Sequence, residues 1–235
     1  METITIYITL ALLFGFFIES IFGFAGTVIS FAILGFFVDI KTLVTLILYV
    51  ATIASIFVVA TDKHAFSKKE YFIMVKLAIP GAIIGALLFK YLSSEALLKI
   101  LAVFLLGLAL QSFFEPKFKN ASKKLLLFTS GIIHGIFGLG GVVAIGTMKN
   151  SFAHKSQLRV TFAFFFITLN IIRAIQYFLQ DTLAYAEIVE FWWIPAPLFF
   201  VIWLGHKVHL KISENLFKKG ISVLLLISGI FFLLT

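Results

Sequence analysis

The stretch FGFAGTVISF, residues 22–31, recurs in related form as FGLGGVVAIG at residues 137–146. The two copies begin 115 positions apart in a chain of 235 residues, so the offset is close to half of the length. In each copy glycines interrupt a long apolar run, and a second, shorter apolar run follows. We therefore expect a duplicated molecule in which each half carries one interrupted helix.

The composition indicates a protein embedded in a lipid bilayer. Hydrophobic residues make up 61% of the chain and charged residues 13%, whereas soluble domains are roughly half apolar and about a quarter charged. Apolar runs of about 20 residues, the length of a bilayer-spanning helix, recur throughout. The short alternating segments of a membrane β-barrel do not occur. We expect an all-α, multi-pass protein of the cell (plasma or inner) membrane.

Missing residue types exclude several kinds of site. The chain has no cysteine, which excludes disulfides, thiolate chemistry and Cys-based zinc or iron–sulfur centres. His206 and His209 form an H-x-x-H pair without an apparent third ligand, and no nucleotide-binding or hydrolase motif occurs. The net charge of +8 lies mainly in loop lysines, which set membrane orientation. We expect no catalytic residue, metal, cofactor or nucleic-acid partner.

About eight hydrophobic segments are expected, four in each half. The polar linker EPKFKNASKK, residues 115–124, separates a first membrane repeat, 1–114, from a second, 125–235. The first apolar run has no basic leader and no cleavage signal, so we interpret it as a retained segment. The expected segments are 4–38, 42–61, 71–92, 95–114, 125–148, 157–180, 191–204 and 220–235.

Loop charges indicate that the two repeats are inverted. Lysine-rich loops follow the second and fourth segments of the first half, but the first and third segments of the second half. If these loops face the cytoplasm, the halves have opposite orientations. Each half would then contain one re-entrant or discontinuous glycine segment and three full spans. The alternative is eight simple spans with parallel repeats, for which the loop charges favour neither side strongly.

The glycine stretches are candidate anion sites. Irregular backbone inside a bilayer persists only where protein buries it or where it lines a polar cavity, and a helix N-terminus at that depth attracts an anion. Paired breaks of this kind place ligand sites near the membrane midplane in secondary transporters. The alternative is that the small residues only permit tight helix packing. The candidate backbone ligands are Gly23, Ala25, Gly26, Thr27, Gly138, Gly140 and Gly141.

The segment 157–180 contains the only two arginines of the chain. Arg159, Asn170, Arg173 and Tyr177 fall on one helical face, and ionisable groups within a membrane usually face a protein interior or an aqueous cavity. We expect Arg173 to be the counter-charge for an anion, because its planar fork suits a sulfonate or carboxylate. Asn170 is expected to orient the anion. Alternatively, Arg173 pairs with a structural carboxylate or reaches the interface; for Arg159, interfacial anchoring is the favoured role.

Glu19 and His134 occupy equivalent positions, each just before a glycine stretch. A carboxylate and an imidazole at this depth can exchange protons with the two sides of the membrane. We hypothesise that they couple transport to a proton gradient. The alternative is a buried ion pair or a histidine that only packs.

These stretches together resemble the sulfite exporter TauE/SafE family of anion permeases. The similarity lies in FGFAGTVISFAILGFFVDIKT in the first half, and in GIFGLGG followed by QLRVTFAFFFITLNIIRAIQYF in the second. Two departures are Ala25, where the family often has glycine, and the large residues Glu19 and His134 before the breaks. The resemblance covers nearly the whole chain and implies a permease for small sulfur-containing or organic anions, such as sulfite, sulfonates or sulfoacetate.

We therefore expect a secondary transporter for a small anion rather than an enzyme. An anion channel of the same fold and a membrane scaffold or assembly protein remain alternatives. The expected partners are the small anion and the lipid bilayer, and the sequence leaves a homodimer open.

Overall fold

The computed structural model describes residues 2–22, 26–62, 65–114, 122–183, 185–207 and 214–234. Every regular element in these ranges is a helix, which confirms the all-α prediction. Two of the expected backbone ligands, Gly23 and Ala25, lie outside the described residues.

Both glycine stretches divide a helix in two. α1 (Glu2–Phe22) ends where the first stretch starts, and α2 (Gly26–Leu34) begins within it. α6 (Lys123–Phe137) and α7 (Gly141–Met148) flank the second break. Between them Gly138 has φ of +81°, a left-handed conformation that L side chains rarely adopt. The predicted breaks are present, and the second one requires glycine at position 138.

Each short helix turns back along the longer helix before it. The N–H of Gly26, at the start of α2, lies 2.9 Å from a carboxylate oxygen of Glu19 on α1. One turn farther along, a Cβ added to Gly15 would lie 2.6 Å from the Oγ of Ser30. The missing Cβ therefore lets α1 and α2 approach closely, and α6 and α7 pack against each other in the same way.

Five helices are long and apolar enough to cross a membrane. Their apolar stretches of 18 to 24 residues match the ~20 residues that span a hydrocarbon core. These helices are α1, α3 (Ile40–Asp62), α4 (Lys68–Tyr91), α5 (Ser94–Phe114) and α8 (Lys155–Leu179).

A further break lies near the end of the chain, where the sequence predicted a single segment at 191–204. Residues 191–194 form turns between α9 (Tyr185–Glu190) and α10 (Pro195–Lys207). Proline lacks an N–H and is tolerated in the first helical turn, so Pro195 starts a helix rather than continuing one. The predicted start at residue 191 is therefore wrong. α11 (Glu214–Leu234) completes the chain.

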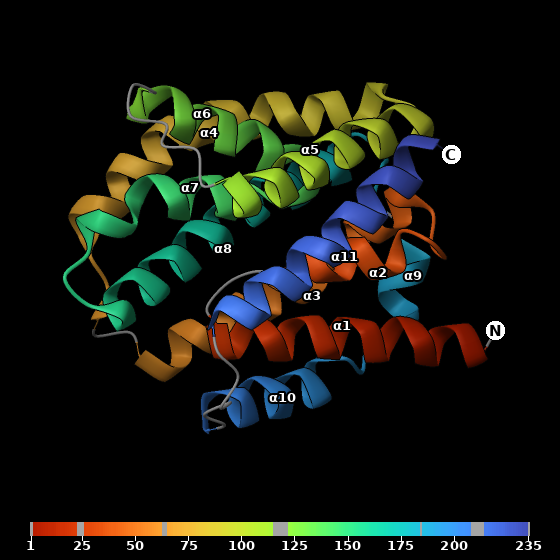
Figure 1. Cartoon of the computed structure of the whole chain (residues 1–235), viewed down its shortest axis with the longest axis horizontal. Coiled ribbons are helices and arrows are strands. Elements are labelled where there is room, and N and C mark those ends of the chain that lie inside the picture. The colour runs from red at the N-terminus through yellow and green to blue at the C-terminus, as the bar shows by residue number, and fades with distance from the viewer. Residues whose placement is uncertain are drawn as a thin grey trace.

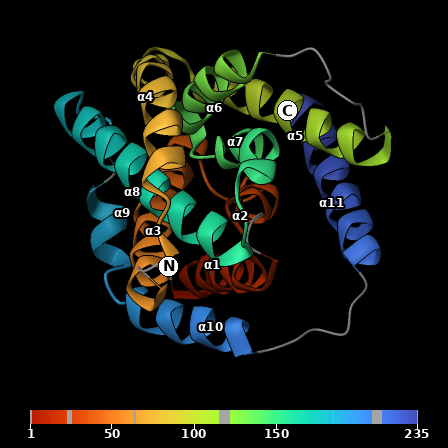
Figure 2. The ribbon, with the colours of Figure 1, turned by 90° about the vertical axis from the view of Figure 1, so that its left-hand side faces the viewer.

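Helix pairs join the two halves of the molecule. α4 packs against α6, α5 against α11, α1 against α10 and α3 against α8 (Figure 1). Seen from the end of the molecule, the short helices α2 and α7 lie inside the ring of longer helices (Figure 2). The two helix breaks are therefore brought to the interior.

The α4–α6 pair is held together by backbone contact. A Cβ added to Gly135 would overlap the carbonyl oxygen of Ala82, and one added to Gly131 would overlap that of Ala78. On α4, Gly85 would similarly overlap the carbonyl oxygen of Ile132. Such small-residue contacts let helix backbones approach closely inside a membrane. The alternative role that the sequence left open for glycines, tight packing, thus applies to this pair.

The basic loops of both halves meet at one end of the molecule. The N–H of Ser67, in the loop before α4, donates to Oγ1 of Thr161 at 2.9 Å, near the start of α8. The ammonium of Lys123, at the start of α6, donates to Oγ of Ser151 at 3.2 Å, in the loop after α7. The starts of α4, α6 and α8 therefore lie at the same end.

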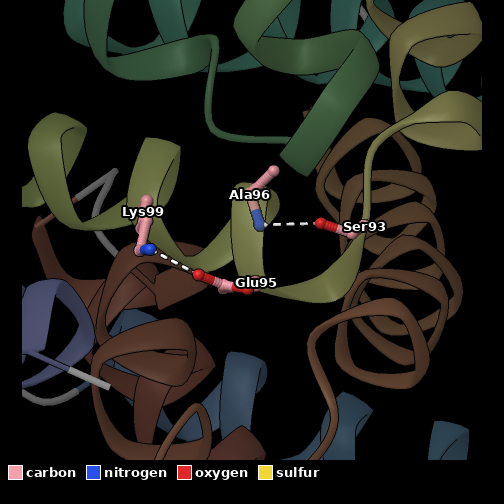
Figure 3. Close-up of polar contacts among 4 residues, drawn as sticks. All are labelled: Ser93, Glu95, Ala96 and Lys99. Atoms are coloured by element: carbon pink, nitrogen blue, oxygen red, sulfur yellow. Dashed lines mark hydrogen bonds and ion pairs between the residues drawn. The ribbon is translucent and has the colours of Figure 1, made fainter.

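The opposite end includes the start of α5. There Ser93 accepts a hydrogen bond at its Oγ from the N–H of Ala96 at 3.2 Å, and Glu95 pairs with Lys99 one turn later (Figure 3). The hydroxyl satisfies one of the N–H groups that every helix start leaves without an intrahelical acceptor. This local capping explains why α5 begins directly after α4 ends.

Candidate functional site

Two faces of α8 differ sharply in polarity and burial. Ile171, Ile175 and Phe178 are 50–58% exposed, as lipid-facing side chains would be. Asn170 and Arg173 are only 2% and 1% exposed, and they point toward the interior of the molecule. The predicted common face of these polar residues is therefore a buried face, and it directs the guanidinium to the inside.

Arg173 is held by neutral partners. Its Nη1 lies 3.4 Å from Oδ1 of Asn170 and its Nη2 lies 3.4 Å from the hydroxyl of Tyr177, while the guanidinium carbon lies 5.4 Å from the Tyr177 ring. Its Nε has no hydrogen-bond partner. Among the side chains that the structure describes, no carboxylate lies within ion-pair distance of Arg173. The alternative that Arg173 pairs with a structural carboxylate therefore has no support among these side chains.

The turn between α6 and α7 faces the guanidinium. A Cβ added to Gly138 would lie 2.8 Å from Nη1 of Arg173. The hydroxyl of Tyr177 donates to the carbonyl oxygens of Gly135 and Ile136, at 2.9 and 3.1 Å. Tyr177 therefore links the end of α6 to Arg173 and fixes the position of the positive charge beside the break.

His134 also faces this site. Its Nε2 lies 3.0 Å from Oδ1 of Asn170, which also accepts from Arg173. Its Nδ1 is buried and has no partner in the described part of the chain. The imidazole lies parallel to the Phe166 ring, with 5.7 Å between centroids and 2° between planes. Asn170 thus joins the histidine and the arginine.

Glu19, beside the first break, has a different kind of partner from His134. One of its carboxylate oxygens accepts a hydrogen bond of 2.9 Å from the N–H of Gly26, the first residue of α2. Among the described side chains Glu19 has no ion-pair partner, so the alternative of a buried ion pair finds no support there. The carboxylate instead occupies the place at the α2 N-terminus where a bound anion would lie.

A cavity of about 50 Å³ connects these residues. The predicted residues that line it come from both halves, whereas Gly26 and Gly140 do not line it. Of the other lining residues, Val142 and Phe166 had no distinguishing signal, because valine and phenylalanine are common along the apolar segments. The predicted lining residues are Glu19, Thr27, His134, Gly138, Gly141, Asn170 and Arg173.

The cavity combines a buried cation, a helix N-terminus and neutral hydrogen-bond donors. Such a set stabilises an anion, because the guanidinium supplies charge-assisted donors and the start of α7 presents N–H groups. No group of three or more acidic, histidine or cysteine side chains that could hold a metal occurs among the described residues.

The comparison with known proteins gives one match. A family model described as Sulfite exporter TauE/SafE matches residues 7–232. No curated protein and no solved structure matches the chain. The matched range includes both helix breaks and the whole of α8.

Proposed function

The chain belongs to the sulfite exporter TauE/SafE family, and we propose that it is a secondary transporter that carries a small anion past Arg173. Membership of this family makes the chain a membrane transporter, in keeping with its five span-length helices. The cargo class that we propose is a sulfur-containing or organic anion, such as sulfite or a sulfonate.

One observation carries the proposal: Arg173 is 1% exposed, lines the cavity and has only neutral partners among the described side chains. A buried charge without a counter-ion is costly. An anion in the cavity would supply that counter-ion. The guanidinium and Gly138, Asn170 and the start of α7 together would then hold it.

The size of the cavity favours a small cargo. Its volume of about 50 Å³ is far below the ~300–1,000 Å³ of pockets that bind drug-sized ligands. A single oxyanion group fits that scale, and the planar fork of Arg173 matches two oxygens of such a group. Larger organic anions would need the cavity to widen during transport.

We propose that the repeats, residues 1–114 and 125–235 joined by the linker 115–124, are inverted. The starts of α4, α6 and α8 lie at the basic end of the molecule. The start of α3 lies at the other end, because Asp39 accepts a hydrogen bond of 3.0 Å from Ser94 at the start of α5. Since α2 leads directly into α3 and α6 starts at the basic end, the two broken segments enter from opposite ends.

The basic end is the proposed cytoplasmic side, following the excess of lysine in cytoplasmic loops. Lys68 and Lys69, at the start of α4, and Lys149, directly after α7, lie at this end. The protein would then lie in the cell membrane with the α6–α7 pair entering from the cytoplasm. Rocking of one repeat against the other would expose the cavity to each side in turn.

Proton coupling through Glu19 and His134 is part of the proposal. Both residues line the cavity that contains Arg173. An ionised Glu19 would repel an anion there, and a neutral Glu19 would not. Binding of the anion would therefore favour uptake of a proton by Glu19, which couples the two movements.

The test is flux into liposomes that contain the purified protein. Radiolabelled sulfite, thiosulfate, sulfoacetate and acetate are offered with and without a pH gradient. When a pH gradient is imposed, we expect at least one sulfur-containing anion to accumulate against its own concentration gradient. Accumulation separates a transporter from a channel, which can only equilibrate the anion, and from a scaffold, which moves none.

Variants of α8 test the site in the same assay. Arg173→Ala should lower transport by roughly 10- to 100-fold, because a lost charge-assisted hydrogen bond costs about 1.5–3 kcal/mol. Arg173→Lys should retain part of it. Gln176→Ala is the matched control, since Gln176 lies one turn away and donates to the carbonyl of Ile83 on α4 rather than lining the cavity. Wild-type transport by Arg173→Ala would refute the site.

A further inference from the structure

A second cavity of about 50 Å³ lies along α8, toward its first turn. Its lining includes the chain's other arginine, Arg159, together with Ala163 of the same helix. The remaining lining residues come from α1, α3, α8 and α10 and are mostly apolar, with Glu19, Ser20 and Ser55 as the polar exceptions. A cationic side chain is therefore placed in a mainly apolar cavity, at a position that the anion site beside Arg173 does not use.

The two cavities share a wall. Glu19, Ser55 and Phe166 line both of them. On α8, Arg159 and Arg173 are 14 positions apart, which corresponds to about 21 Å along a helix. The same face of α8 thus carries an arginine in each cavity, with Phe166 midway between them.

The ring of Phe166 covers the start of α7. A Cβ added to Gly141, the first residue of that helix, would lie 2.6 Å from the ring. The ring also lies parallel to the imidazole of His134, with 5.7 Å between the centroids. Phe166 therefore sits between the helix N-terminus that would hold an anion and the cavity that contains Arg159.

We propose that the Arg159 cavity is a waiting site for the transported anion and that the Phe166 side chain is the gate between it and the Arg173 site. This inference rests on the proposed anion transport, and it adds a second anion site and a route. The ligand is of the same class, a small oxyanion, because a guanidinium binds oxyanions through paired donors. Rotation of one ring joins the two cavities.

The waiting site lies nearer the cytoplasmic end than the Arg173 site. Arg159 is in the second turn of α8, which starts at that end, whereas Arg173 lies 14 positions farther along the helix. The lysines of the loops at this end attract anions from the cytoplasm. An anion would thus meet Arg159 first, and then the wall formed by Phe166 and Glu19. A neutral Glu19 removes the repulsion at that wall, so gate passage and proton uptake occur together.

The natural absence of cysteine allows a direct test by thiol labelling. Single cysteines are placed at Ala163, in the waiting site, and at Ala51, in the Arg173 cavity. A methanethiosulfonate reagent that carries a sulfonate is applied to the cytoplasmic face of inverted vesicles. We expect Ala163→Cys to react at least about tenfold faster than Ala51→Cys, which corresponds to a barrier difference of about 1.4 kcal/mol. Ser156→Cys, at the exposed start of α8, is the positive control.

Two second-site changes separate the gate from the charge. Phe166→Ala, and to a lesser degree Phe166→Leu, should raise the labelling rate at Ala51→Cys by about tenfold. Arg159→Gln should slow labelling of Ala163→Cys by the anionic reagent by about tenfold, and should leave a trimethylammonium analogue of the reagent unaffected. Thermal melting of each variant checks that it is folded.

Equal labelling of Ala51→Cys and Ala163→Cys with Phe166 present would overturn the gate. Equal effects of Arg159→Gln on both reagents would overturn the anion site. Labelling does not require transport, so the two proposals fail separately. The predicted labelling pattern without flux of any probe anion would refute the transport proposal alone. Flux of a probe anion without the predicted labelling pattern would refute the gate and the waiting site alone.

Discussion

At each of the two helix breaks a long helix is followed by a short one. The two breaks differ in what lies at the start of the short helix. At the first break, the Glu19 carboxylate accepts the N–H of Gly26 at 2.9 Å. At the second break, the Gly138 turn faces the guanidinium of Arg173, and His134, the counterpart of Glu19, contacts Asn170 instead. One helix start is occupied by the chain's own anion, whereas the other is left beside a cation.

This difference indicates how a duplicated scaffold acquires direction. A site with two equivalent helix starts and no internal anion would bind cargo at both. In the transport that we propose, the internal carboxylate competes with the cargo at the first start, and the arginine attracts the cargo at the second. The second half would then supply the binding charge, and the first half would supply a group that can take up a proton.

The largest effect is expected from the turn at the second break. Gly138→Ala forces an L side chain into the left-handed region, at about 1–2 kcal/mol, and places a methyl group against Nη1 of Arg173. Transport should fall by at least about tenfold. Gly146→Ala on the adjoining α7 meets nothing within 4 Å and serves as the control in the same liposome flux assay. Equal transport by the two variants would contradict the role assigned to the turn.

The next effect concerns the carboxylate at the first break. Glu19→Gln keeps an oxygen that can accept from Gly26 but removes the charge that competes with the anion. We expect flux to lose its dependence on the proton gradient while downhill movement of the anion persists. Initial rates over a range of pH measure this. His134→Gln is the companion variant, and an unchanged pH profile in Glu19→Gln would exclude coupling through that residue.

A smaller effect, on thermal stability, should distinguish how the two broken segments pack against their neighbours. Gly135→Ala drives a methyl group into the backbone of Ala82 on α4, and such overpacking costs about 1–3 kcal/mol. Gly205→Ala on α10 meets the hydroxyl of Ser20 on α1, which can rotate away, and the Cβ of Ser20 at 2.9 Å, which needs only a small shift between the two helices. Thermal melting in detergent should rank Gly135→Ala below Gly205→Ala. Gly107→Ala, whose added methyl group meets nothing within 4 Å, is the control. The reverse ranking would contradict the proposed difference in packing.

The smallest effect is expected from Tyr177→Phe. The change removes the hydroxyl that donates to the carbonyls of Gly135 and Ile136 and accepts from Arg173, but keeps the ring beneath the guanidinium. A neutral hydrogen bond contributes about 1 kcal/mol, so transport should fall by only about fivefold. A loss as large as that of Arg173→Ala would mean that Tyr177 contacts the cargo itself.

Much of the plan was predictable from the order of residues. Glycines that interrupt a long apolar run predict a break, and both breaks occur where the glycines are. The helical period placed Asn170 and Arg173 on one face, and that face is buried. These predictions succeeded because they depend on local geometry alone.

Other features depend on contacts between distant segments. The break before Pro195 was missed because residues 191–194, FWWI, are as apolar as the helix that follows them. Phe166 carries no signal among 30 phenylalanines, and its place over Gly141 follows from how α8 crosses α7. The Glu19–Gly26 contact was likewise not predicted, since it arises only when α2 folds back along α1.

Composition, hydropathy and periodicity alone therefore determined the membrane class, the positions of the two breaks and the buried face of α8, because each follows from the backbone and from the solvent that surrounds a segment. Tertiary structure alone decided which helix start is occupied. Glu19 and His134 stand at equivalent positions, but the carboxylate meets a backbone N–H while the imidazole meets Asn170. Those partners come from packing between helices, which no local pattern encodes.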